Sequence, residues 1–243
     1  MANILAIDTS TSACSVALSY SGNIQEDFRL VPQSHTQCLL PMVDQMLAGH
    51  QLSLRQLDAI ALTTGPGSFT GLRIGLGVVQ GLAFGADLPV ISVSTLRIMF
   101  NSARRLLAPV SQQWIVPCLD ARMQEVYWAC FRNADDLPNI AVVADSVMAP
   151  TLMISQLQAL DGHLLGVGDG WACVPENERQ DFMVCPEFYP HAYDVAVLAQ
   201  SELAAGNEQN AVSVQPVYIR NEVSWKKRQK IRGGDYETGS KTS

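Results

Sequence analysis

Apolar and polar positions along this chain fall into short runs whose spacing changes between strand-like and helix-like, and the order of these runs occurs twice. In the first half, three strand-like runs come before a helix-like run, and strands and helices then alternate. The predicted strands are 4–9, 14–20, 22–30, 59–62 and 90–93, and the predicted helices are 34–47, 70–86 and 94–107. Ser94 is the expected N-cap of the last of these helices.

The second half repeats this plan. Its predicted strands are 114–119, 125–131, 140–144 and 164–167, and its predicted helices are 151–160 and 193–205. Three antiparallel strands followed by alternating helix and strand, present twice, predict an α/β fold of two ribonuclease H-like subdomains. This is the plan of the actin, sugar-kinase and heat-shock ATPase (ASKHA) group, which holds nucleotide between its halves. We expect an N-terminal subdomain, a C-terminal subdomain and a basic, disordered tail at 1–107, 108–225 and 226–243.

Charge is divided unevenly between the body and the tail. All four lysines lie in the last eighteen residues, so residues 1–225 carry ten arginines against twenty-one carboxylates, a formal charge of −11, and the tail from Lys226 carries +4. The lack of lysine excludes Schiff-base and phosphate-loop lysine chemistry from the body. An acidic body repels phosphate backbones, so we expect the chain alone to bind RNA weakly. The tail is either an RNA contact or a solvated end.

The spacing of histidine and cysteine argues against a metal site. Six cysteines and four histidines include no C-x-x-C and no histidine pair at ligand spacing. We therefore expect no metal, and we interpret the cysteines as small core residues of a cytoplasmic protein. The N-terminus lacks the basic region of a secretory signal. The uncharged run at 74–86 has thirteen residues, fewer than a bilayer span needs, so no membrane contact is expected.

The stretch Thr63–Gly75, TTGPGSFTGLRIG, joins a predicted strand to a predicted helix. A glycine-rich turn in this place brings backbone N–H groups together with the positive end of a helix dipole, which is typical of an anion or nucleotide site. The spacing matches neither G-x-x-x-x-G-K-[ST] nor G-x-G-x-x-G. Two interpretations stay open: a weak nucleotide or anion contact, or a structural turn with Thr70 as N-cap. The contact residues would be Gly67, Ser68, Thr70 and Arg73.

Aspartates at strand ends extend this candidate site. Asp8 stands where ASKHA folds hold a Mg-nucleotide, so Asp8 and Ser10 join the contact set; a hairpin turn with an Asx hydrogen bond is the alternative. The second half offers Asp120-Ala121-Arg122, which is its counterpart or, alternatively, a buried Asp–Arg pair or turn. It also offers Gly168-Asp169-Gly170, which is a second phosphate loop or a simple turn. Ser68 is not in a G-x-S-x-G elbow, and no catalytic set is recognised.

The helix at 70–86 carries five glycines, although each interior glycine costs about 1 kcal/mol relative to alanine. Five positions fall on one face and form a small-residue ridge that lets another backbone come close, namely Gly71, Gly75, Val78, Leu82 and Gly85. The ridge packs either on the protein's own sheet or on a helix of a partner subunit. In the second interpretation, the partner or dimer surface consists of Leu39, Val43, Gly71, Gly75, Val78 and Leu82.

Five segments share their pattern with one known family. They are ILAIDTST (4–11), SHT followed by LPM (34–42), GPGSFTGLRIG (65–75), LDARMQEVYWA (119–129) and PVYIRN (216–221). Together they resemble the TsaB family, also called YeaZ, over residues 2 to about 227. The resemblance implies a non-catalytic scaffold for a TsaD-like transferase. That enzyme moves threonylcarbamoyl from threonylcarbamoyl-AMP to the adenosine beside the tRNA anticodon.

The resemblance also implies partners and cofactors. The expected partners are the TsaD-like transferase, a TsaE-like ATPase and, in isolation, a second copy of the chain, with tRNA contacted only through the complex. No cofactor of its own is expected, beyond a weak ADP or ATP contact at the complex interface. TsaD-like paralogues hold metal with H-x-x-x-H just after the strand that is 90–93 here. The aligned positions are Thr95 and Met99, which cannot replace imidazoles.

Two functions of other classes stay open. One is an autonomous nucleotide-dependent kinase or ATPase of the same fold. The other is a peptidase, a label that the wider glycoprotease-like family has carried.

Overall fold

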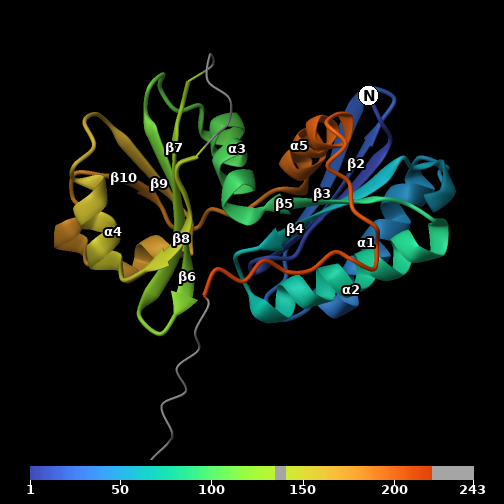
Figure 1. The fold of residues 1–243 in the computed structure, drawn as a ribbon, viewed down its shortest axis with the longest axis horizontal. Helices are drawn as coiled ribbons and strands as arrows, with labels where there is room; N and C mark the ends of the chain where they lie inside the picture. The colour runs from blue at the N-terminus through green and yellow to red at the C-terminus, as the bar shows by residue number, and fades with distance from the viewer. Residues whose placement is uncertain (135–140, 221–243) are drawn as a thin grey trace, which may run out of the picture.

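The computed structural model describes residues 1–134 and 141–220, and these form two five-stranded sheets that stand beside each other (Figure 1). The first sheet has the strand order β3-β2-β1-β4-β5, and the second has the order β10-β9-β6-β7-β8. The first five strands are β1 Ile4–Asp8, β2 Ala13–Tyr20, β3 Asn23–Leu30, β4 Ala59–Gly65 and β5 Val90–Ser94. The second five are β6 Trp114–Arg122, β7 Glu125–Arg132, β8 Ala141–Met148, β9 Leu164–Val167 and β10 Met183–Cys185.

The two sheets have the same topology when read in chain order. In each, three antiparallel strands come first and two parallel strands join the other side of the first strand. The predicted fold class, α/β with two related subdomains, is confirmed. The α-helices are α1 His35–Gly49, α2 Phe69–Ala86, α3 Thr95–Leu107, α4 Pro150–Leu157 and α5 Ala192–Ala204. Short 3-10 helices are η1 Leu54–Gln56, η2 Asp169–Cys173 and η3 Glu176–Glu178.

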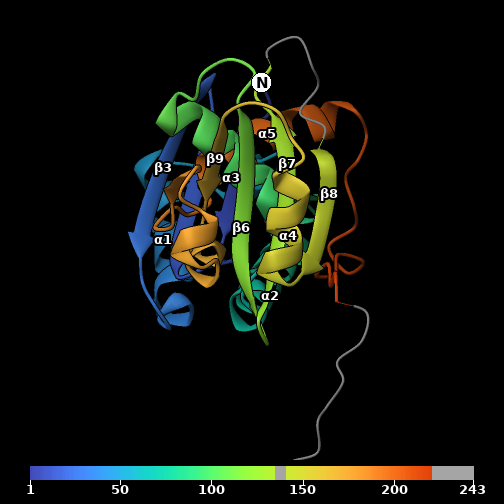
Figure 2. The same cartoon turned by 90° about the vertical axis from the view of Figure 1, so that its left-hand side faces the viewer.

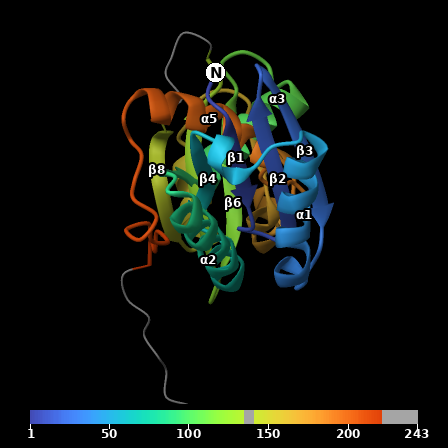
Figure 3. The same cartoon turned by 90° about the vertical axis from the view of Figure 1, so that its right-hand side faces the viewer.

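The first sheet is covered on both faces. Side chains of β1 alternate between the faces, because successive residues of a strand point to opposite sides. Leu5 and Ile7 pack with α1 and α2, and Ile4 and Ala6 pack with α5. Figure 3 shows α1 and α2 next to each other on the near face of this sheet. Burial on both faces explains why β1 and β4 read as almost continuous apolar runs.

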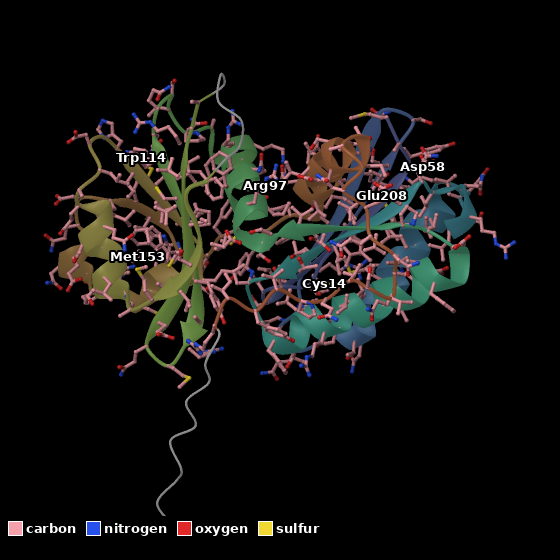
Figure 4. The ribbon with its side chains drawn as sticks, viewed as in Figure 1. Cys14, Asp58, Arg97, Trp114, Met153 and Glu208 are labelled. Atoms are coloured by element: carbon pink, nitrogen blue, oxygen red, sulfur yellow. The ribbon has the colours of Figure 1, made fainter. Side chains whose placement is uncertain are left out.

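The second sheet is also covered on both faces (Figure 2). Met153 of α4 packs with Trp128 and Trp171 on one face, and Phe100 of α3 stacks on Phe131 on the other. Where the first half has the long helix α2, the second half has only η2 and η3. The indole of Trp171 in η2 lies directly against β9, because a Cβ at Gly166 of β9 would be only 2.3 Å from its ring. Figure 4 labels Met153 in this half and Cys14 in the first.

Helices α3 and α5 each cover the sheet of the other half. The apolar face of α3 packs on β6, β7 and β9, although α3 follows β5 in the chain, and α5 packs on the first sheet. Helices α3 and α5 therefore connect the two halves across the predicted boundary at residues 107 and 108, and that boundary stays a prediction. No loop separates β5 from α3, because Ser94 ends the strand and also caps the helix, accepting a hydrogen bond from Arg97 N. The helix thus begins at the strand end and leads towards the second sheet.

The segment after α5 also belongs to the first half. It forms an antiparallel bridge between Gln209 and Val90, and buries Ala211 and Val214 in the core beneath α1 and α2. Gln80 of α2 donates to Val214 O at 3.0 Å, so the segment runs beside α2 (Figure 1). The predicted end of the C-terminal subdomain at 225 and the tail at 226–243 lie outside the described residues.

Candidate functional site

The glycine-rich loop between β4 and α2 rests on the turn between β1 and β2. Ser68 N donates to Ser10 O at 2.7 Å, so this loop amide is used within the chain. Helix α2 begins at Phe69, and Ser68 is its N-cap, with Oγ accepting from Gly71 N at 3.3 Å. The predicted N-cap, Thr70, is therefore wrong, and its side chain is exposed in the first turn.

Three glycines make this close contact possible. A Cβ at Gly67 would lie 2.4 Å from Ser10 O, and one at Gly71 would lie 2.1 Å from Thr9 O. A Cβ at Gly75 would lie 2.4 Å from Thr9 Oγ1, and that hydroxyl donates to Gly71 O at 2.8 Å. The inward glycines of α2 thus have a packing role inside the chain, as the first interpretation of the ridge expected.

Asp8, at the end of β1, is completely buried. Its Oδ1 accepts from Thr63 Oγ1 at 2.5 Å and from Ser10 Oγ at 2.7 Å, with Ser10 N more distant at 3.4 Å. Its Oδ2 has no hydrogen-bond partner in the part of the chain that the structure describes. Burial raises the pKa of this carboxyl from 3.8 to about 6, and the hydrogen bonds from Thr63 and Ser10 oppose that shift.

The predicted nucleotide-contact residues do not line one common site. Asp8 and Ser10 are turned inward and bonded to each other, so the Asx-type turn describes them. Thr70 and Arg73 lie on the outside of α2. The Arg73 guanidinium lies 3.8 Å from the centroid of the Phe69 ring. Gly67 and Ser68, between these groups, contact Ser10 as described.

Most residues of the predicted partner surface are turned towards the interior of the chain. Leu39 and Val43 are buried in the core beneath α1, and Gly71 and Gly75 are buried against Thr9. Val78 and Leu82 are half-buried and pack on the same core. The spacing of Gly71 and Gly75 does identify a closely packed face of α2, but that face packs on Thr9 of the same chain.

The opposite face of α2 is open. A Cβ at Gly77, Gly81 or Gly85 would meet no atom of the described chain within 4 Å, and these glycines are spaced four residues apart along one side. Phe84 on this face is 74% exposed, and Leu40 on the neighbouring α1 is 50% exposed. Within the described residues, α2 is also long and apolar enough, at eighteen residues, to cross a membrane by length and composition alone. Its inward face, however, packs on the core.

The corresponding turn of the second half is exposed. Arg122 Nη1 pairs with Asp120 Oδ2 at 2.9 Å, and the guanidinium is largely in solvent, so this is a surface pair. Asp169 Oδ1 accepts from Asp120 N at 3.0 Å, and burial raises the pKa of Asp169. Gly168, with φ of 104°, leads into η2, which agrees with a simple turn.

Metal ligands are not gathered at either turn. Residues 1–134 and 141–220 contain no group of three or more His, Cys, Asp or Glu side chains that could hold an ion. Thr95 and Met99, which stand at the metal-ligand positions of the TsaD-like pattern, are buried in the first turns of α3. Met99 packs in the core of the second half, close to Gly168.

Comparison with known proteins gives consistent matches over most of the chain. Residues 29–222 match the family model of TsaD, described as tRNA N6-adenosine threonylcarbamoyltransferase. The tRNA threonylcarbamoyladenosine biosynthesis protein TsaB of Escherichia coli K12 is 40% identical over 227 residues, which cover 92% of this chain and 97% of that protein. The Haemophilus influenzae protein of the same name is 39% identical over 231 residues, covering 92% and 96%. The solved structure of YeaZ from Pseudomonas aeruginosa superposes with a TM-score of 0.76 at 36% identity, over 90% of this chain and 100% of that one.

Proposed function

This chain belongs to the TsaB family of tRNA threonylcarbamoyladenosine biosynthesis proteins, and on that premise we propose that it is a non-catalytic subunit that binds and supports a TsaD-like transferase. The observation that carries the proposal is the open face of α2, made of Gly77, Gly81 and Gly85 with Phe84 beside them. This face replaces the inward ridge as the partner surface.

The helix stability that is lost at these glycines supports the proposal that a partner helix packs on them. Each interior glycine lowers helix stability by about 1 kcal/mol relative to alanine. For Gly71 and Gly75, the close contact with Thr9 offsets this cost. Gly77, Gly81 and Gly85 have no such contact within the described chain, so a gain from outside it accounts for them. A line of glycines lets a partner helix approach closely, and Phe84 and Leu40 supply apolar area to bury.

The remaining features agree with a supporting role. The residues that a nucleotide would need do not converge, which argues against an autonomous kinase or ATPase and leaves any ADP or ATP contact to the complex interface. Ser68 caps α2, which argues against a peptidase nucleophile at this loop. The formal charge of −11 over residues 1–225 opposes direct binding of tRNA, so we propose that tRNA and a TsaE-like ATPase are met within a cytoplasmic complex.

A substitution on the open face tests the proposal. Gly81→Leu improves helix propensity at a position with free space, so the isolated variant should melt no lower than the wild type. The bulky side chain should hold a partner helix away and weaken co-purification of the TsaD-like subunit by roughly 5- to 150-fold, the effect of about 1–3 kcal/mol of overpacking.

A matched control is Ser155→Leu, which adds the same side chain to an exposed position of α4 in the other half. It should leave binding unchanged. If the Gly81→Leu chain binds its partner as tightly as the wild type, the open face of α2 is not the partner surface.

A further inference from the structure

The segment 211–220, which follows α5, has two parts that are held differently. Ala211 and Val214 are buried and anchor its first part in the core of the first half. Beyond them, Val217 and Tyr218 are 51% and 50% exposed, and this part belongs to no helix or strand. We call the second part, residues 216–220, the clasp.

The clasp touches elements of both halves. Val217 N donates to Thr64 O at 2.8 Å, Tyr218 Oη accepts from Arg73 Nε at 3.3 Å, and Arg220 pairs with Glu125 and donates to Met123 Sδ at 3.4 Å. The first contact is at the carboxyl end of β4, the second is on α2, and the third is at the start of β7. The clasp therefore bridges from the first subdomain to the strand hairpin of the second (Figure 1).

The clasp covers the end of the sheet at which the glycine-rich loop begins. Val217 O lies 2.9 Å from the position of a Cβ at Gly65, so the two backbones are in direct contact. The ring of Tyr218 lies 6.0 Å from that of Phe69, the first residue of α2. Tyr218 thus contacts both Phe69 and Arg73. These two residues lie on the outward side of α2, as Gly77 and Gly81 do.

The contacts of the clasp are weak compared with its anchor. Val217 and Tyr218 are half-exposed, and the side chains of Arg220 and Glu125 are 18% and 37% exposed, so water can take the place of these contacts when the clasp separates. Val214, by contrast, is held by apolar burial in the main core. Segments with few buried apolar contacts open locally without global unfolding.

We propose that residues 216–220 are a detachable clasp. Closed, it ties the carboxyl end of β4 and the first turns of α2 to β7. Open, with Ala211 and Val214 still anchored, it frees Phe69 and Arg73 at the N-terminal end of the open α2 face and removes one tie between the halves. The inference goes beyond the proposed function, since it concerns the chain alone and holds whichever partner binds.

Hydrogen exchange of the full chain tests the clasp directly. The amide of Val217 should exchange through local opening, at a rate that stays constant in low denaturant, and the bonded amides of β4 should exchange only through a larger unfolding event. Arg220→Gln removes the ion pair with Glu125 and should speed exchange at Val217 roughly threefold or more, while leaving the β4 amides unchanged.

The matched control is Arg122→Gln, which makes the same change in charge on the same hairpin of the second half but touches no clasp residue described here. It should leave exchange at Val217 unchanged. Two results would overturn the proposal: exchange at Val217 that follows the β4 amides as denaturant is added, or an equal response to both substitutions.

Discussion

At the scale of single residues, Asp8 is a carboxyl group in an unusual environment. It is fully buried, and its pKa is raised from 3.8 to about 6. The folded chain therefore binds this proton more tightly than the unfolded chain does. The contribution to stability is fully present below pH 4 and is lost as the pH rises to about 6. Two pKa units correspond to about 3 kcal/mol.

We predict that Asp8→Asn removes this dependence. The amide oxygen keeps the bonds from Thr63 and Ser10, and no charge is formed. Denaturant unfolding at a series of pH values should show the free energy of unfolding of the variant gaining on the wild type between pH 4 and 6, and a constant difference above that. Parallel curves for the two proteins over this range would contradict the raised pKa.

The sequence identified Asp8 as a candidate site residue, but it could not predict which residues donate hydrogen bonds to its carboxyl group. An aspartate at a strand end is visible in the apolar pattern, and so is the glycine-rich loop. That Asp8 accepts from Thr63, fifty-five residues away, depends on the pairing of β1 with β4, which no local pattern contains. For the same reason, the sequence could not show that the turn after β1 and the glycine-rich loop contact each other through Ser10 and Ser68.

At the scale of elements, α2 has glycines of two kinds. Gly71 and Gly75 face inward and contact Thr9. Gly77, Gly81 and Gly85 face outward, where a Cβ would have no described atom within 4 Å. Spacing alone indicated that one face was tight, but the same spacing results from internal packing or from a partner. Helices and strands themselves were predicted to within a few residues, whereas β10, with three residues, is too short to show a period.

We predict that alanine at these two kinds of position acts in opposite directions. Gly71→Ala places a methyl group 2.1 Å from the backbone oxygen of Thr9, which cannot turn away, so it should destabilise the chain by about 1–3 kcal/mol. Gly81→Ala adds a methyl group in free space and should stabilise it by up to about 1 kcal/mol. Denaturant unfolding of both variants measures the difference. Equal effects would show that the two faces do not differ in this way.

At the scale of the whole molecule, the halves are interlocked. Most apolar residues of α3 are part of the second core, whereas Ile98 and α5 are part of the first. Arg105 of α3 pairs with Asp194 of α5 at 2.7 Å. Arg97 of α3, which is labelled in Figure 4, also pairs with Glu202 of α5 at 2.8 Å. The duplication was predictable from the order of runs. The exchange of helices was not, since an amphipathic helix shows which of its faces is apolar but not which sheet that face covers.

This exchange predicts how fragments of the chain behave. Residues 1–107 contain the whole first sheet, but they lack α5, so the face of β1 with Ile4 and Ala6 loses most of its cover. Of α3, only Ile98 packs on that sheet, and the apolar residues that pack on the second sheet have no partner. The fragment should show no cooperative thermal transition, while the full chain should melt in one. A chain that joins residues 1–94 to 190–220 through a flexible linker restores α5 to the first sheet and removes α3, so it should regain a cooperative transition below that of the full chain. A cooperative melt of residues 1–107 alone would instead mean that the first half is complete without α5.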